Sequence, residues 1–573
     1  MRDRVKSTPS EVEPERAQRL DRGHRGRRGG ASFLAAIAAV VALGAPGHAA
    51  DEFSGADKLR AIYSAEFRFT KDGLPVVPVA IAEGLQSVTI SAGAGGVRLL
   101  PEGDGGAEIR ADDTWQIRAS ATSAARLRFW TVVWRGPVAK GQDADAQVAL
   151  WKGKGENARR FEQGTLFGVG GEVLDRREAI VGVGPNASPE AAERASNRLA
   201  AKLPLRQPGV FTELVDRPHG QLEATGGSSG FKVRNEGVLW FVPAGDAPLR
   251  VEASGERGGE KIKTTGSYAG RVYVTIDRMG NMAVVNAVPE NKLLAGLIPA
   301  EIFPSAPDEA LKAQAVAARG ELLSKIGTRH IGDPFRLCSQ THCQVYSGTG
   351  HETARTTAAV EATRGEVLFE ASGGLADPVY SANCGGHTEN NENAWPEMPA
   401  LASLRGHRDA DKKAGDPYAG GVTAGNVAAF IASPPPAFCG RSKLGAGDRF
   451  RWTVTRTKDE LEKLLAKYRL GAIHSMEVLE RGVSGRARAV RVTGAAGSEV
   501  IRGELRIRQA LGNLRSSLFV VEVQSGSAVF HGAGFGHGVG MCQTGAIGMA
   551  EAGKSYREIL RHYYPGTALR KLW

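Results

Sequence analysis

One acidic side chain stands in a setting that suits acid–base chemistry. Glu301 precedes a helix expected over 308–326, and its apolar neighbours are Ile298, Ile302 and Phe303. Apolar surroundings exclude water from a carboxyl group and raise its pKa. A carboxyl group that stays protonated near neutral pH can act as a general acid. The spacing leaves a second interpretation open, in which Glu301 is an exposed loop residue.

A group of cysteine and histidine side chains follows that helix. Its members are His330, Cys338, His342 and Cys343, with Cys384 and His387 further along the chain. Nitrogen and sulfur ligands in such a short span can form a tetrahedral zinc site. Adjacent strand residues point to opposite faces, so His342 and Cys343 can bind one ion only from a turn. The alternatives are a disulfide, Cys338–Cys343 or Cys338–Cys384, or buried thiols that bind nothing.

A glycine-rich segment near the end of the chain suits close approach to a ligand. Residues 531–545 contain six glycines and present His537 and Gln543. No strand–helix unit with a later acidic residue surrounds them, so a nucleotide fingerprint is not indicated. A wall of glycine backbone that offers His537 and Gln543 to a sugar fits better.

Residues 380–395 form a second candidate sugar-binding segment. Ser381 and Thr388 supply hydroxyl groups on either side of a Gly-Gly turn, and Trp395 supplies an aromatic ring. Hydrogen-bonding groups beside an aromatic ring are typical of a carbohydrate groove. The alternative is a polar loop whose tryptophan packs inside the protein.

The elements around these residues are short strands and a few helices. Glycine makes up 74 of 573 residues, about twice its usual share, which favours turns and strands. The helix over 308–326 is predicted to begin with a capping box, because Ser305 and Asp308 have that spacing. Residues 272–276 and 282–286 alternate as a hairpin. The fold class expected is α+β.

The beginning of the chain indicates export. Residues 1–30 are basic and polar, 33–43 are apolar, and small residues follow up to Ala50. That order predicts a secretory signal peptide, with an uncleaved anchor as the alternative. Without residues 1–50, 64 basic and 57 acidic residues remain, a net charge of +7. A mildly basic envelope or secreted protein favours anionic polymers such as wall glycans, and the absence of nucleic-acid motifs makes nucleic acid an unexpected partner.

Four segments together resemble the SpoIID/LytB family, that is, stage II sporulation protein D and its amidase-enhancer relatives. They are 309–319 (EALKAQAVAAR), 343–348 (CQVYSG), 384–389 (CGGHTE) and 536–543 (GHGVGMCQ). The family implies lytic transglycosylase activity on peptidoglycan strands stripped of their peptides. Its acid/base glutamate corresponds to Glu301 in the sequence Pro299-Ala-Glu301. The alternative within the same family is a wall-binding or amidase-activating protein without catalysis.

The resemblance also bears on the cysteines and on the sugar contacts. Some family members hold zinc after the helix, and the counterparts here are Cys338, His342 and Cys343, with His330 as a fourth ligand. Candidate sugar contacts are Ser381, Thr388, His537 and Gln543. The family's usual aromatic pair after Arg319 is replaced by Gly320-Glu321, which puts the packing of the helix end in doubt.

The chain is accordingly divided into five predicted regions. They are a signal peptide and leader (1–50), the N-terminal β-rich part (51–150), an α+β insert (151–225), a glycine-rich connection (226–267) and the catalytic region (268–573). The insert resembles a sporulation-related-repeat (SPOR-like) module, a family that binds peptidoglycan glycan. A purely structural insert is the alternative. The expected architecture is therefore a β-rich domain with a few packed helices and one small α+β module.

Overall fold

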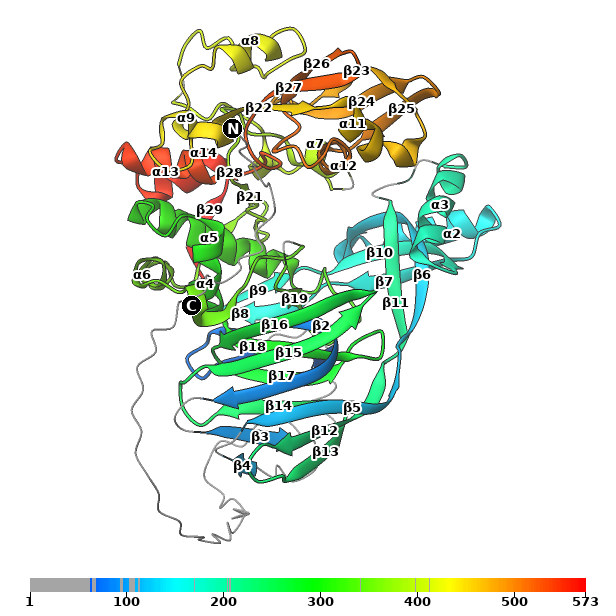
Figure 1. Cartoon of the computed structure of the whole chain (residues 1–573), viewed down its shortest axis with the longest axis vertical. Helices are drawn as coiled ribbons and strands as arrows, with labels where there is room; N and C mark the ends of the chain where they lie inside the picture. Colours follow the sequence, from blue (N-terminus) through cyan, green and yellow to red (C-terminus); the bar gives the residue numbers. More distant parts are fainter. Residues whose placement is uncertain are drawn as a thin grey trace, which may run out of the picture.

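The structure is a computed structural model of the 573-residue chain (Figure 1). It describes residues 62–63, 68–92, 96–101, 109–111, 114–169, 171–203, 205, 208–340, 342–396, 398–411 and 413–573. The predicted signal peptide and leader, residues 1–50, lie outside the described residues. Antiparallel sheets and separate groups of helices make up the rest, so the α+β class is confirmed.

A large sheet occupies the lower half of Figure 1 and contains thirteen strands among the described residues. These are β1 (Arg68–Phe69), β2 (Pro75–Ala92), β3 (Val97–Pro101), β4 (Ile109–Ala111), β5 (Trp115–Ser123), β12 (His219–Gly226), β13 (Lys232–Glu236), β14 (Val238–Pro243), β15 (Leu249–Arg257), β16 (Glu260–Tyr268), β17 (Arg271–Ile276), β18 (Met282–Pro289) and β19 (Leu337–Cys338). The main path runs β13-β12-β5-β2-β18-β17-β14-β3-β4. The predicted hairpin is β17–β18, and the carboxylate of Asp277 closes its turn by accepting from the N–H groups of Met279 and Asn281.

The predicted glycine-rich connection, residues 226–267, contains β13, β14, β15 and β16, which are all strands of this sheet. Strand β2 is long, and it continues through Gly84 at φ +72°. Only glycine takes that backbone conformation without strain, so it bends the strand without ending it.

A smaller α+β unit has its four-stranded sheet and two helices on the right in Figure 1, while its hairpin β8–β9 lies nearer the middle, beside β19. Its elements are β6 (Arg126–Pro137), η1 (Val138–Lys140), α2 (Gly141–Gly153), β7 (Ala158–Gln163), β8 (Leu166–Val169), β9 (Glu172–Asp175), β10 (Glu178–Asn186), α3 (Pro189–Ala200) and β11 (Gly209–Asp216). Helix α3 begins after Ser188, which caps it by accepting from Ala191 N–H. The sheet order is β11-β6-β10-β7, so the unit includes β6, which precedes the range 151–225.

Three helices stand above the large sheet: α4 (Glu290–Glu301), α5 (Asp308–Lys325) and α6 (Ala354–Ala362). Helix α5 is buried along nearly its whole length, since its alanines allow close packing on every side. The predicted capping box is wrong: the helix begins after Pro307, and no side chain caps it. Proline suits this position because its ring fixes φ and it needs no N–H partner.

The C-terminal half forms the upper part of Figure 1. Its elements are η2 (Gly348–His351), β20 (Glu366–Phe369), β21 (Tyr380–Ser381), α7 (Asn391–Ala394), η3 (Ala402–Leu404), α8 (Val427–Ala432), α9 (Phe438–Arg441), α10 (Gly447–Phe450), β22 (Arg451–Arg456), α11 (Lys458–Leu464), η4 (Ala466–Tyr468), β23 (Ile473–Arg481), β24 (Ala487–Gly494), β25 (Gly497–Arg502), α12 (Glu504–Ala510), β26 (Phe519–Gln524), β27 (Ser527–Ala533), β28 (Met541–Cys542), α13 (Gln543–Glu551), α14 (Tyr556–Tyr563) and β29 (Ala568–Lys571). The parallel pair β21–β28 brings residues 380–381 beside 541–542. Because of this pairing, the last part of the chain lies beside helices α4 and α5.

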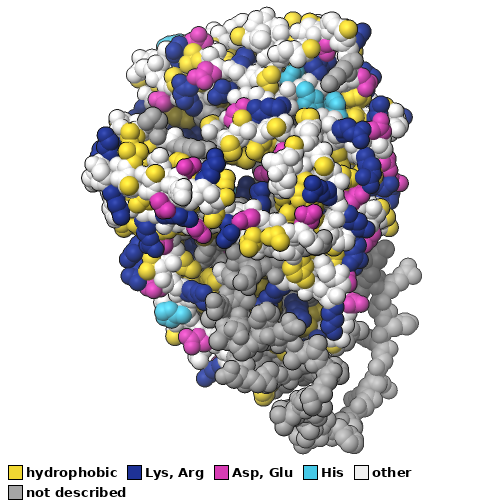
Figure 2. All heavy atoms as spheres, turned by 180° about the vertical axis from the view of Figure 1, so that it is seen from behind, with side chains coloured by type: hydrophobic (Ala, Val, Ile, Leu, Met, Phe, Trp, Pro, Cys, Tyr) yellow, Lys and Arg dark blue, Asp and Glu magenta, His cyan; other side chains and the backbone are white. Residues whose placement is uncertain are grey.

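Basic, acidic and hydrophobic side chains are interspersed on the face shown in Figure 2, and Lys or Arg side chains line a hollow near its middle. Among the residues that the structure describes, no helix combines the length and the apolar character that a membrane crossing requires.

Candidate active site

Glu301 is the last residue of α4 and lies at a pocket of about 240 Å³. The pocket is lined by Pro299, Ala300, Glu301, Ile302, Phe303, Pro304, Arg449, Gln543, Thr544 and Ile547. Helix α4, the segment after it, α10 and α13 therefore enclose this space together. Pro299 inside α4 and the extended conformation of Ile302 end the helix at the glutamate.

Burial raises the pKa of Glu301 to about 7, and the negative charge of Glu321 acts in the same direction. Two groups oppose them: the backbone N–H of Val345, which donates to Glu301 Oε1 at 3.4 Å, and the charge of Lys325. Near neutral pH, the protonated and ionised forms of Glu301 are therefore both populated. A single group with that property can give and take a proton in one reaction cycle.

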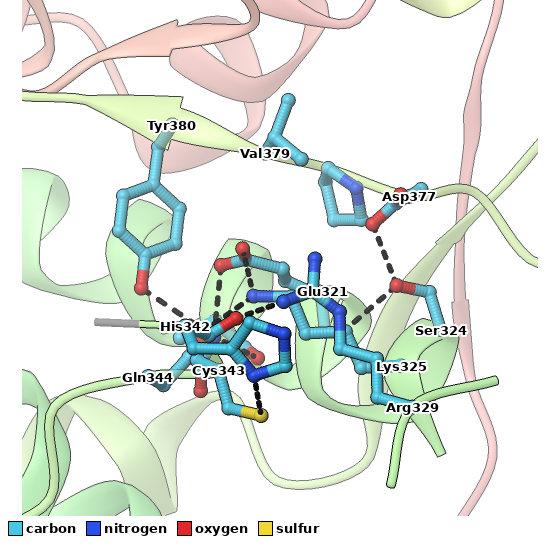
Figure 3. Close-up of polar contacts among 12 residues, drawn as sticks. Glu321, Ser324, Lys325, Arg329, His342, Cys343, Gln344, Asp377, Val379 and Tyr380 are labelled. Carbon is cyan, nitrogen blue, oxygen red and sulfur yellow. Dashed lines mark hydrogen bonds and ion pairs between the residues drawn. The ribbon is translucent and has the colours of Figure 1, made fainter. Parts of the chain in front are cut away.

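Two side chains hold Glu321 on α5, and Tyr380 lies beside them (Figure 3). Lys325 Nζ donates to Glu321 Oε1, and Gln344 Nε2 donates to Oε2 at 2.8 Å. The hydroxyl of Tyr380 accepts from Gln344 at 3.4 Å, and burial together with Glu301 and Glu321 raises the pKa of Tyr380 well above its usual value. Tyr380 thus keeps its proton and remains a hydrogen-bond donor beside the two carboxyl groups.

Gln543, one of the predicted sugar contacts, lies directly against the glutamate. Its Nε2 donates to the backbone oxygen of Glu301 at 2.9 Å and to Gln314 Oε1 at 3.2 Å. Gln543 lines the pocket as the first residue of α13. The structure therefore brings Glu301 and Gln543 together across 242 positions of sequence.

Ser381 and His537 lie close to each other near Tyr380. Ser381 is buried, its hydroxyl has no hydrogen-bond partner among the described residues, and the backbone of Gly536 packs against it. His537 is half-buried with its ring 4.8 Å from that of Trp395. Burial and the nearby Arg486 lower the pKa of His537 to about 3, so its imidazole is neutral.

Thr388 lies elsewhere. Its hydroxyl accepts from His407 N–H at 2.9 Å and its side chain is 1 % exposed, so its contacts are internal. The glycine-rich segment also packs largely against protein. At Gly540, whose φ is +69°, a Cβ atom would lie 2.0 Å from the carbonyl oxygen of Val379. Glycine is needed there for the close approach of β28 to β21.

The structure brings the side chains of the predicted cysteine–histidine group together. Donor atoms of His330, Cys338, His342 and Cys343 all lie within 4.8 Å of one another. His330 Nε2 is 3.2 Å from Cys343 Sγ, and His342 Nδ1 is 3.6 Å from Cys343 Sγ and 3.8 Å from Cys338 Sγ. Because His342 and Cys343 lie in a turn, both reach the same point.

The side chains fit a zinc ion better than a disulfide. Two sulfur and two nitrogen donors are a common zinc set, and Asp333 Oδ2 lies 3.0 Å from His330 Nδ1, which orients the other ring nitrogen toward the sulfurs. All five cysteines are free thiols. The disulfide alternatives are wrong: Cys338 and Cys343 face the two histidines, and Cys384 lies in a different cluster.

The cysteine–histidine group is connected to Glu301 by a short segment. Lys325 Nζ donates to the carbonyl oxygen of Cys343 at 2.6 Å, and Val345, two residues later, donates to Glu301. Sequence reasoning missed Glu321 and Lys325 as members of the site. Their i, i+4 spacing on α5 was the available signal, since such a pair shares one helix face.

Comparison with known proteins identifies two parts of the chain. Residues 278–369 match the family described as "Stage II sporulation protein", which covers α4, α5 and the cysteine–histidine group. Residues 430–540 match a "Domain of unknown function (DUF8618)", which covers β22 to β27.

Curated relatives match across about half of the chain. An uncharacterized protein of Brachyspira hyodysenteriae is 31 % identical over 50 % of this chain and 68 % of its own length. The amidase enhancer of Bacillus subtilis is 29 % identical over 48 % of this chain and 40 % of its own length. Stage II sporulation protein D of Bacillus subtilis is 27 % identical over 55 % of this chain and 82 % of its own length.

The fold and the site thus define a β-rich α+β protein with a half-buried carboxyl group at a pocket beside a candidate metal site. The chain belongs to the SpoIID/LytB family.

Proposed function

We propose that this chain is an exported lytic transglycosylase that cleaves peptidoglycan glycan strands. The observation that carries the proposal is the carboxyl group of Glu301, whose pKa burial and Glu321 raise to about 7, at the edge of a pocket. Family membership supports a substrate in the cell wall. The pocket is bordered by polar groups and by Arg449, which suits a sugar polymer that carries carboxylates.

Glu301 serves first as the acid. In its neutral form it donates its proton to the glycosidic oxygen between N-acetylmuramic acid and N-acetylglucosamine, and that bond breaks as positive charge develops at the muramoyl C1. The charges of Glu301 and Glu321 then stand near the developing cation. Such negative groups stabilise the transition state more than the neutral substrate.

Ionised Glu301 serves next as the base. It accepts the proton of the muramoyl C6 hydroxyl as that oxygen forms a bond to C1, and this produces the 1,6-anhydro sugar. The proton that leaves in the first step is replaced in the second, so no water is consumed. Gln543 holds the backbone of Glu301 in place, and Ser381 and His537 are the proposed hydrogen-bonding groups for the sugar.

A zinc ion held by His330, Cys338, His342 and Cys343 would supply structural stabilisation. Its ligands lie at the end of α5 and in the turn that leads to Val345, whose N–H contacts Glu301. The proposed role is to fix that N–H relative to the carboxyl group. Asp333 positions His330 for this purpose.

The substitution Glu301→Gln tests the proposal. We expect the yield of anhydro-muramoyl products from peptide-free glycan to fall by about 10²–10⁴-fold, because the amide cannot transfer a proton. The products are measured by mass spectrometry, and circular dichroism checks that the variant folds. Glu361→Gln, an exposed residue of α6, is the control and should leave the yield unchanged. An unchanged yield from Glu301→Gln would contradict the proposal.

The second candidate is a wall-binding protein that activates an amidase. It is favoured by the similarity to the amidase enhancer of Bacillus subtilis, of which this chain covers 40 %. Binding of the wild-type protein to glycan without any cleavage product, together with a faster reaction of an added wall amidase, would support this candidate instead.

A further inference from the structure

A second cluster of thiols lies outside the site described above. Cys384, Asp409, Cys439 and Cys542 are each fully buried, and their donor atoms all lie within 4.8 Å of one another. The pairing β21–β28 places Cys384 near Cys542, α9 contributes Cys439, and the loop after η3 contributes Asp409. Four segments that are distant in the sequence therefore meet at one point.

The distances fit a tetrahedral ion. Cys384 Sγ and Cys439 Sγ are 3.7 Å apart. Zinc–sulfur bonds of about 2.3 Å at tetrahedral angles place two sulfurs about 3.8 Å apart. Three sulfurs and one carboxylate oxygen make a donor set that selects zinc over the hard cations calcium and magnesium. We propose that Cys384, Asp409, Cys439 and Cys542 bind a second, structural zinc ion.

Surrounding hydrogen bonds already orient the ligands. Cys542 Sγ accepts from the N–H groups of Cys384 at 3.1 Å and Gly545 at 3.3 Å. Asp409 accepts from Cys439 N–H at 2.9 Å and from the hydroxyl of Tyr563 at 2.6 Å. Outer contacts of this kind are typical of metal sites, because they fix each donor before the ion arrives.

Gly545 makes room for this arrangement. A Cβ atom there would lie 2.1 Å from the Tyr563 hydroxyl and 2.8 Å from both carboxylate oxygens of Asp409. The charge is partly offset as well. Three thiolates and one carboxylate carry four negative charges, of which the ion neutralises two, and Arg451, which interacts with Cys439 and Cys384, offsets one more. Binding releases the three thiol protons to water.

A disulfide explains less of the cluster. It would join two of the thiols and leave the third thiol and Asp409 buried without a role. The ion uses all four donors. It also fixes two segments of the candidate active site, because Gln543 follows Cys542 directly and Ser381 precedes Cys384 by three residues. The inference does not depend on the proposed function, since metal content is measured without substrate.

Metal analysis of the purified full chain tests the inference. We expect two zinc ions per chain in the wild type, one in Cys439→Ser and one in Cys343→Ser, which keeps only the second site. The double variant should contain none. Ser517→Ala is the matched control: Ser517 is fully buried with no hydrogen-bond partner among the described residues, and this variant should keep two ions.

Two outcomes would overturn the inference. One is a wild-type chain with a single zinc ion that Cys343→Ser abolishes. The other is a peptide map that contains a Cys384–Cys439 link. If Cys439→Ser fails to fold, the variant with both Cys338→Ser and Cys343→Ser still decides, since the only cysteines that it retains are those of the second cluster. Replacing zinc with cobalt in that variant should give thiolate-to-cobalt absorption, and its absence would contradict a cysteine site.

Discussion

At Glu301, burial and a second carboxyl group act in the same direction. Both raise the pKa of the glutamate, to about 7, and Lys325 limits the effect because it pairs with Glu321. The replacement of the family's usual aromatic pair by Gly320-Glu321 thus falls inside the site. It supplies the carboxylate that tunes Glu301, and the small Gly320 packs against Pro378, where a Cβ atom would lie 2.6 Å from that ring.

The pH dependence of the proposed reaction follows from this pair. The acid step requires protonated Glu301, so we expect the rate to fall as pH rises through about 7. Glu321→Gln removes a negative neighbour and frees the positive charge of Lys325, and both changes lower the pKa of Glu301. The falling limb should therefore move to lower pH by about one unit.

Rates of product formation across pH 5–9 measure this shift. Glu361→Gln is again the control and should retain the wild-type profile. If the fall in rate occurs at the same or a higher pH in Glu321→Gln than in the wild type, Glu321 does not raise the pKa of Glu301.

Among the elements, α5 is held by one buried ion pair. Arg319 Nε donates to Glu290 Oε1 at 2.6 Å, and both side chains are fully buried. The guanidinium also donates to the carbonyl oxygens of Thr363 at 2.7 Å and Glu366 at 3.1 Å. It thereby joins the starts of α4 and β20 to α5, which carries Glu321.

Arg319→Met should lower the free energy of unfolding by about 3–5 kcal/mol, because it leaves Glu290 buried without its cation. Chemical denaturation followed by circular dichroism measures the change. Arg491→Met is the matched control, since its ion pair with Glu477 is exposed, and its effect should stay below about 1 kcal/mol. Equal effects of the two substitutions would contradict a structural role for the buried pair.

In the whole molecule, sequence patterns predicted local features better than long-range pairings. The β17–β18 hairpin depends on neighbouring residues, and this prediction is confirmed. The pairings of β14 with β3 and of β15 with β2 were not predicted, because these partners lie far apart in the chain. The contact of Gln543 with Glu301 was only a hypothesis, because nothing local couples the two positions.

The two chain connections between the small α+β unit and the large sheet lie side by side. The unit's first and last strands end side by side, where Arg126 and Asp216 form an ion pair at 2.6 Å. Just beyond them, β5 pairs with β12 at Ser123 and His219. The unit also packs on the rest of the chain, since Arg176 donates to the carbonyl oxygen of Leu375 at 3.1 Å.

Deletion of residues 126–216 should therefore leave a folded protein. Four residues would then connect Ser123 to His219, a length that suits a hairpin. We expect a loss of about 1–3 kcal/mol in the free energy of unfolding from the lost contacts. Product yield from soluble glycan should persist, while binding to insoluble peptidoglycan should fall if the unit is SPOR-like.

Sedimentation with purified cell walls measures the binding, and denaturation measures the stability. An insoluble deletion variant would show that the unit is needed for folding. Unchanged binding to the walls would contradict the SPOR-like interpretation.

The distance in sequence between Glu301 and Gln543 has a consequence for the timing of activity. Glu301 precedes Gln543 by 242 positions, so its pocket is completed only when α13 near the end of the chain is in place. A half-finished or truncated polypeptide therefore carries the acid without the cavity around it.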